Sequence, residues 1–198
     1  LLRVKKIGED KFEFDFTDVR KWVRLALKHG AEYIEWAHFF TPAPTSGKHP
    51  QRIYEKGEGA VGKILWDPDI SATSETFRSF LSQFVPVFKQ FLEEEGILDK
   101  SLFHCADEPD GEAQIEDYKK ARALLREFAP WMKVMDALSD TKLATLKLVE
   151  NPIPSILTAA NFKAINLDTW VYFCCGPREG YLQRLMDTHL SKIRMCGL

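Results

Sequence analysis

The strongest constraint on the fold is an order that recurs about five times, in which a short apolar segment is followed by a segment with helical periodicity. Short apolar runs predict strands over residues 31–40, 101–106, 133–137, 152–157 and 168–175. Helical spacing of apolar residues predicts helices over 17–30, 74–96, 115–128, 141–149, 161–165 and 181–189. Continuously apolar strands that alternate with helices are typical of a parallel sheet covered by helices, so the sequence predicts an α/β fold.

The same pattern is compatible with an open doubly wound sheet and with a barrel. No glycine-rich phosphate loop follows any predicted strand, which argues against a nucleotide-binding sheet. Acidic, histidine and aromatic residues recur at the carboxyl ends of strands, where a (β/α)8 TIM barrel has its active face. They are His38, Asp107, Glu108, Asp136 and Tyr172. Because a full barrel takes about 250 residues, we expect residues 1–198 to be a single, incomplete barrel domain that lacks the first and last strands.

Two further segments give local predictions. Residues 11–16 alternate between phenylalanine and charged side chains, which indicates a short half-exposed strand or an extended lead-in. Residues 41–72 are rich in proline and glycine and predict a long connection above the carboxyl ends of the strands. Within this connection, Trp66 either lines a substrate cleft or anchors the segment to the body of the domain.

Composition excludes several classes of protein. The formal net charge of -2, with scattered basic residues, gives no basic stripe for nucleic acid. No apolar run reaches the roughly 18 residues of a membrane span. The four cysteines, Cys105, Cys174, Cys175 and Cys196, form no CxxC pair. Free thiols and the absence of a visible signal peptide favour the cytoplasm.

We expect neither a cofactor nor a bound metal. A zinc site formed by His104, Cys105 and Asp107 has suitable residue types. However, neighbouring side chains of an extended strand point to opposite faces, so these three would not converge on one ion.

The most informative stretch is the strand over 101–106, which ends in the adjacent carboxylates Asp107 and Glu108 and is stopped by Pro109. Two carboxyl groups at the end of a barrel strand are typical of a glycosidase. The alternative is that they only cap the following turn. Since adjacent strand residues diverge, both can reach one pocket only if the strand is twisted or bulged at its end.

Four motifs in this order resemble a known family: His-Cys-Ala-Asp-Glu-Pro at 104–109, Lys-Val-Met-Asp-Ala at 133–137, Asn-Pro-Ile-Pro-Ser at 151–155 and Trp-Val-Tyr-Phe-Cys-Cys-Gly-Pro at 170–177. With Tyr181, Gln183, Arg184 and the basic segment 192–195, the chain resembles the catalytic domain of glycoside hydrolase family 123, also catalogued as domain of unknown function 4091. Relatives usually have Asn-Arg-Phe where this chain has Gln-Arg-Leu at 183–185. They also carry a final apolar strand after the position of Leu198.

The resemblance implies a (β/α)8 barrel that removes β-linked N-acetylgalactosamine with retention of configuration and with help from the substrate. Glu108 then corresponds to the general acid, and Asp107 to the residue that orients the acetamido group. We expect sugar hydroxyls to contact Glu35, His38, Asp136, Trp170 and Tyr172. Arg184 and Arg194 are expected to form buried salt bridges. The alternative to an enzyme with a glycan substrate is a non-catalytic carbohydrate-binding or structural remnant of a truncated barrel.

Overall fold

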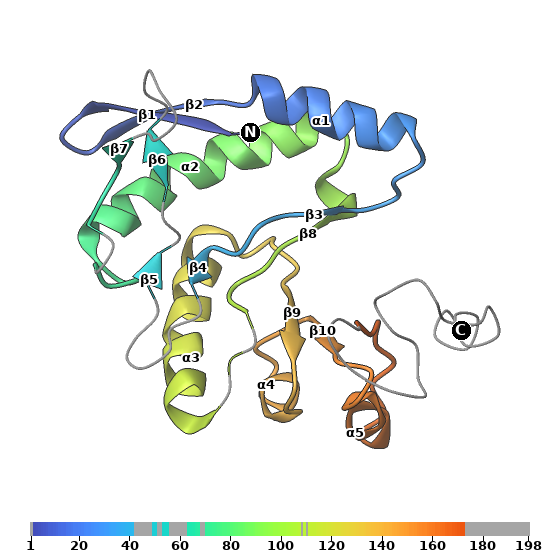
Figure 1. Ribbon diagram of the computed structural model, residues 1–198. Helices are drawn as coiled ribbons and strands as arrows, with labels where there is room; N and C mark the ends of the chain where they lie inside the picture. Colours follow the sequence, from blue (N-terminus) through green and yellow to red (C-terminus); the bar gives the residue numbers. More distant parts are fainter. Residues whose placement is uncertain are drawn as a thin grey trace.

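The computed structural model describes residues 2–41, 49–50, 53–55, 63–67, 70–107, 109 and 111–172. These residues form a mixed α/β domain with short sheets (Figure 1). In this part of the chain, no helix has the length and apolar character that a membrane span requires.

Parallel strands run through the centre of the domain in chain order, as the sequence predicts. β3 (Ile34–Glu35) pairs in parallel with β8 (Ser101–Leu102), and Phe103 forms a parallel bridge with Val134. β9 (Met135–Leu138) pairs in parallel with β10 (Asn151–Pro154), and Ser155 forms a parallel bridge with Tyr172. The described residues form no closed barrel, so the observed fold is the mixed α/β arrangement alone.

The predicted strand over 31–40 is shorter in the structure. Strand pairing covers only Ile34 and Glu35. The residues that follow stay beside β8 through isolated hydrogen bonds. The amides of Trp36 and Phe39 donate to the carbonyls of Leu102 and His104, at 2.9 and 3.1 Å. The predicted strand over 168–175 is described only as far as Tyr172, and the predicted helix over 181–189 lies outside the described residues.

Helices connect the parallel strands. α2 (Glu75–Glu94) with the 3-10 turn η1 (Leu98–Lys100) lies between β3 and β8, and α3 (Gly111–Phe128) lies between β8 and β9. α4 (Lys142–Thr145) precedes β10, and α5 (Ala159–Ala164) follows it. The strand β10 forms although two of its four residues are proline.

The amino-terminal part adds an antiparallel hairpin, in which β1 (Arg3–Gly8) pairs with β2 (Lys11–Asp15), followed by α1 (Thr17–Lys28). The sequence predicts β2 and α1 but not β1. Phe16 is the N-cap residue of α1 and makes no side-chain cap hydrogen bond, but the Asp15 carboxylate accepts the amide of Thr17, the first residue of the helix, at 2.8 Å. Gly30 has φ +92°, a conformation that glycine adopts readily, and it follows the end of α1 as expected.

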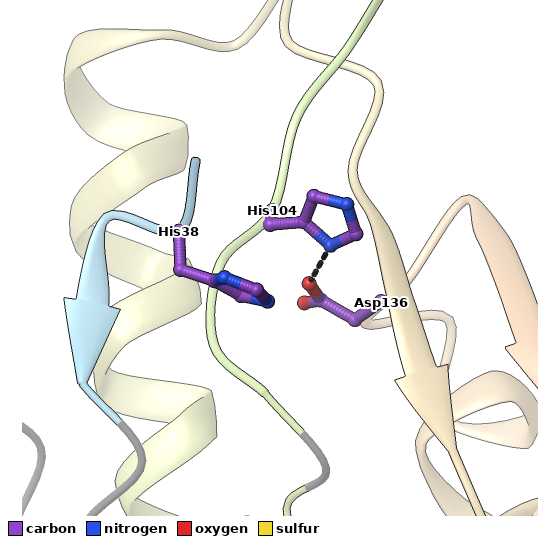
Figure 2. Close-up of side chains that lie close together, drawn as sticks. All are labelled: His38, His104 and Asp136. Carbon is purple, nitrogen blue, oxygen red and sulfur yellow. Dashed lines mark hydrogen bonds and ion pairs between the residues drawn. The ribbon is translucent and has the colours of Figure 1, made fainter. Parts of the chain in front are cut away.

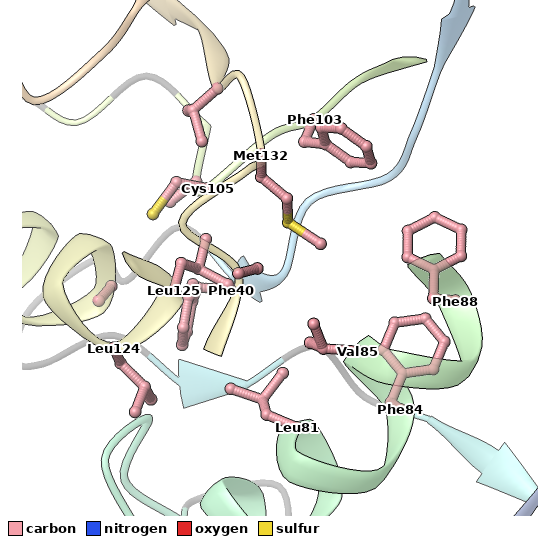
Figure 3. Packing of buried hydrophobic residues seen from close by; sticks show 14 of the residues in the cluster. Phe40, Leu81, Phe84, Val85, Phe88, Phe103, Cys105, Leu124, Leu125 and Met132 are labelled. Carbon is pink, nitrogen blue, oxygen red and sulfur yellow. The ribbon is translucent and has the colours of Figure 1, made fainter. Parts of the chain in front are cut away.

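α2 forms over the predicted range and carries a stripe of buried phenylalanines into the core. Ser74 accepts the amide of Phe77 at 3.3 Å and caps its start, and Gly96, at φ +65°, follows its end. The helix continues through Pro86. Its buried rings pack in series, with Phe80, Phe84 and Phe88 at centroid distances of 5.4 and 5.1 Å. Figure 3 shows part of this stripe facing Phe103 and Met132, so α2 closes one side of the core.

Two short antiparallel pairs lie in the segment that the sequence predicts to be a long connection. β4 (Phe40–Thr41) pairs with β5 (His49–Pro50), and β6 (Tyr54–Glu55) pairs with β7 (Lys63–Ile64). Trp66 is buried and packs edge-on against Phe77 and Phe80 of α2. It therefore anchors the segment to the body of the domain and does not line a cleft.

A buried arginine joins α3 to the strands. The side chain of Arg122 is 2% exposed, and its guanidinium donates to both carboxylate oxygens of Glu150, at 2.7 and 2.8 Å. Its Nε donates to the carbonyl of Leu148 at 3.0 Å, while Glu150 also accepts the amide of Val134 at 3.0 Å. One ion pair thus holds three segments together.

Candidate active site

Polar side chains from the ends of β3 and β8 meet a carboxylate in the first half of β9. Glu35 is the last residue of β3, and His38 follows three residues later. His104 follows β8, and Asp136 lies in β9. Because β3, β8 and the segment that enters β9 lie side by side in parallel, these residues come together although up to about 100 positions separate them. Figure 2 shows the rings of His38 and His104 with the Asp136 carboxylate.

His104 lies between two carboxylates. Its Nδ1 is 3.0 Å from Asp136, and its Nε2 is 2.7 Å from Glu35. Only an imidazolium carries a proton on both nitrogens and can donate to both partners. Burial acts to lower the pKa of His104, but the hydrogen bonds and negative charges of Asp136 and Glu35 outweigh it, so the pKa is raised. The charged form therefore fits this position.

Asp136 is the buried end of this arrangement, with 0% of its side chain exposed. Besides His104, its oxygens accept the hydroxyl of Tyr118 and the amides of Cys105 and Ala106. Burial raises the pKa of Asp136, while the bonds from His104 and Tyr118 act in the opposite direction. Since protein donors surround the carboxylate, it lies behind His104 and not on the surface that a sugar would contact.

His38 is a neutral counterpart to His104. The centroids of the two rings are 4.5 Å apart, and Nε2 of His38 is 3.9 Å from Oδ1 of Asp107. Burial, followed by the positive charge of His104, lowers the pKa of His38, and the nearby carboxylates only partly offset this. The site thus combines an imidazolium and a neutral imidazole within one cluster.

Asp107 lies at the rim of the cluster, with half of its side chain exposed. Glu108, its predicted partner, lies outside the described residues. The chain bends at Cys105 and again at Asp107, so it has left the strand conformation before it reaches the acid pair. The strand end is therefore irregular, which is the condition under which adjacent carboxylates could reach one pocket.

A protein-family model described as "Glycoside hydrolase 123, catalytic domain" matches residues 1–198. The chain belongs to this glycoside hydrolase family. It also resembles the solved structure of a family 123 glycoside hydrolase from Clostridium perfringens, which was studied for glycolipid glycan hydrolysis, with 19% identity and a TM-score of 0.62. That match covers 90% of this chain and 32% of the relative, so the chain spans about a third of the relative's length. No curated protein matches the sequence.

Of the other predicted sugar contacts of this family 123 segment, Trp170 lies apart from the cluster. The ring of Trp170 contacts Tyr33, with 5.6 Å between centroids. Tyr33 immediately precedes β3, whereas Glu35 and His38 lie toward its other end. Tyr172 continues the sheet, since its amide donates to Pro154 at 3.1 Å and its carbonyl accepts the amide of Ile156 at 2.9 Å. The structure therefore brings together Glu35, His38 and Asp136, but not Trp170.

Within the described residues of the family 123 segment, three residues could ligate a metal ion by type and distance. The nearest ligand atoms of His38, His104 and Asp136 lie within 4.8 Å of one another. However, the two nitrogens of His104 face Asp136 and Glu35, and an imidazolium has no lone pair to offer a metal. His104, Cys105 and Asp107, which the sequence does not predict to converge on an ion, are not grouped as metal ligands in this part of the chain. Cys105 itself is buried and is not part of a disulfide bond.

Sequence reasoning missed two members of the family 123 cluster. It considered His104 only as a possible zinc ligand, and it gave Tyr118 no role beyond its place in the predicted helix over 115–128. A usable signal existed for His104, because a histidine within an apolar strand needs a hydrogen-bond partner when buried. Asp136, at the same place in the next strand, was the nearest candidate. No comparable signal exists for Tyr118, whose hydroxyl direction depends on how α3 packs.

The two histidines of the family 123 cluster should titrate on opposite sides of the ordinary imidazole pKa of about 6.5. Histidine NMR over a pH series should place His104 above this value and His38 below it, with assignments from His38→Asn and His104→Asn. Because the folded-state pKa of His104 is raised, its stabilising effect is complete at acid pH and is lost as pH rises through that pKa. The lowered pKa of His38 has the opposite effect. Coincident titrations would contradict the two-carboxylate arrangement.

Proposed function

We propose that this protein is a glycoside hydrolase that cleaves a terminal β-linked N-acetylgalactosamine, or a related 2-acetamido sugar, with retention of configuration. The observation that carries the proposal is the cluster of Glu35, His38, His104 and Asp107 at the carboxyl ends of the paired parallel strands β3 and β8. This is where a βα enzyme binds its substrate. Membership of a glycoside hydrolase family supports the same reaction class.

In the proposed mechanism, the acetamido oxygen of the substrate attacks its own anomeric carbon. Glu108 protonates the glycosidic oxygen, the bond to the leaving group breaks, and a cyclic oxazolinium ion forms. Asp107 accepts a hydrogen bond from the acetamido N–H and offsets the positive charge of the ring. Glu108 then removes a proton from water, which opens the ring from the side that the leaving group left. Two displacements at one carbon retain its configuration.

The exposure of the cluster supports a division of roles. The side chain of Glu35 is 64% exposed, and only one of its oxygens is bonded to His104. The other oxygen can therefore accept a hydrogen bond from a sugar hydroxyl. His38, being neutral, can either donate to a hydroxyl or accept from one. Asp136 has no exposed surface and acts through its neighbours. Tyr172 and Trp170 are proposed to contact more distant parts of the substrate, since the ring of Trp170 packs against Tyr33.

We also propose that the parallel strands are part of a (β/α)8 barrel in a single domain. Among the described residues, β3 pairs with β8 only and has no strand on its other edge. An apolar cavity of about 470 Å³ lies beside it, lined by residues of α1, of α2 and of the segment that follows β3, which include Val19, Trp36, Phe84 and Phe88. A further parallel strand beside β3 would fill this space and pair with its free edge.

Substrate choice tests the proposed function. The longest natural chain that contains residues 1–198 should release the aryl group from an aryl β-N-acetylgalactosaminide. It should act at least about a hundredfold more slowly on the matched aryl β-galactoside, because a 2-hydroxyl cannot form the cyclic intermediate and intramolecular attack carries a large advantage. Product release followed by absorbance gives both rates.

Equal cleavage of the two substrates would contradict the role of the acetamido group. Binding of N-acetylgalactosamine without any turnover would instead support a carbohydrate-binding remnant. An unchanged anomer in the first-formed product, observed by NMR, is the independent check on retention.

A further inference from the structure

The chain is bent where it enters Asp107, and a single side chain holds the bend. The amides of Cys105 and Ala106 both donate to Asp136, at 3.1 and 3.4 Å. Successive amides of an extended strand point in opposite directions. Two successive amides can therefore share one carboxylate only if the backbone turns between them, immediately before Asp107.

Asp136 is itself held from two other directions. The ring of His104 donates to one of its oxygens, and the hydroxyl of Tyr118 on α3 donates to the other. Hydrogen bonds to an ionised group are about twice as strong as neutral ones. The carboxylate is completely buried, so water does not compete for these donors. Its position relative to β8, β9 and α3 is thus determined by the fold.

We infer that Asp136 is a positioning residue, because it holds the bend that sets the direction of Asp107. This inference rests on the proposed function, in which Asp107 orients the acetamido group. It replaces the direct sugar contact that the sequence predicts for Asp136. The carboxylate has no exposed surface with which to touch a substrate, and its amide partners lie one and two residues before Asp107.

The decisive variant is Asp136→Asn, measured in the longest natural chain. Asparagine keeps the volume but exchanges one acceptor oxygen for an NH2 donor, so at least one of the surrounding donors loses its partner. The probe is a thiazoline analogue of N-acetylgalactosamine, in which the acetamido group is closed onto the anomeric carbon. We expect its inhibition constant to rise about tenfold or more, because small displacements of a catalytic group are costly.

The inhibition constant separates positioning from loss of folded protein. A variant that only reduces the folded fraction lowers the rate but leaves the inhibition constant of the remaining enzyme unchanged. The matched control is Asp99→Asn, an exposed acid in η1 at the opposite end of β8, which should leave the inhibition constant unchanged. An Asp136→Asn enzyme with the normal inhibition constant would overturn the inference.

A crystal structure of the unmodified protein with the thiazoline analogue provides a test that does not depend on the variant folding. We expect Asp107 to be hydrogen-bonded to the nitrogen of the analogue, and the amides of Cys105 and Ala106 to remain hydrogen-bonded to Asp136. Contact between Asp136 and the analogue, or release of both amides, would overturn the inference. If the unmodified protein neither binds the analogue nor cleaves either aryl glycoside, the proposed function fails first and the inference fails with it.

Discussion

Glu108→Gln should lower turnover of alkyl or oligosaccharide N-acetylgalactosaminides by about 10²–10⁴-fold, the usual contribution of a general acid. The leaving alkoxide of such substrates needs a proton, and glutamine cannot supply one. The dinitrophenolate of a dinitrophenyl glycoside leaves without being protonated, so the rate of bond cleavage for that substrate should fall far less. Steady-state kinetics with leaving groups of different pKa measures directly how turnover depends on the leaving group's need for a proton.

Glu112→Gln is the matched control. Glu112 lies four residues after Glu108, is exposed, and forms an ion pair with Lys142. The substitution makes the same chemical change on the surface of α3 and should leave turnover within about twofold, as expected for a surface site. Unchanged turnover of alkyl glycosides in Glu108→Gln would remove Glu108 from the mechanism.

Arg122→Ala should lower the free energy of unfolding by about 3 kcal/mol, the low end of the range for breaking a buried ion pair. The substitution leaves Glu150 without its bidentate partner and the carbonyl of Leu148 without its donor. Glu150 is 39% exposed, so water replaces part of the lost interaction and keeps the effect from being larger. Denaturant unfolding followed by circular dichroism measures the difference.

Arg126→Ala serves as the comparison for Arg122. Arg126 also contacts Glu150, at 3.2 Å, and the carbonyl of Lys147 at 2.7 Å, but 43% of its side chain is exposed. We expect a loss of about 1 kcal/mol or less, as is usual for exposed ion pairs. Similar losses for the two arginines would show that burial does not decide the strength of this contact.

The helices were predictable because the information that specifies them is local. α2 has a serine cap, an apolar stripe with the helical period and a glycine just after its end, all within about 25 residues. β1 was missed because Val4 is its only buried residue, so the strand has no hydrophobic pattern to detect. The short pairs between 40 and 64 depend on partners across a loop and leave little trace in the sequence.

The candidate site was partly predictable for a topological reason. Once the strands were taken as parallel, Glu35, His38 and Asp136 had to share one edge of the sheet. The direction of each side chain was not predictable. Asp136 faces inward because the bend after His104 turns two amides toward it, and that bend depends on contacts between residues about 30 positions apart. The sequence predicts which strand each acidic residue belongs to. It does not tell whether an acidic side chain contacts a sugar or is a buried hydrogen-bond acceptor.

The acceptor role of Asp136 has a consequence for the order in which the protein is made. Residues 104–106 are synthesised about 30 residues before the carboxylate that holds them. Synthesis proceeds from the amino terminus at about 5–20 residues per second. Asp136 is therefore synthesised on the order of seconds after residues 104–106. The amino-terminal hairpin, α1 and α2 can pack during that interval. The acid-bearing bend can form only after β9 arrives, which makes assembly of the site a late event in the folding of the chain.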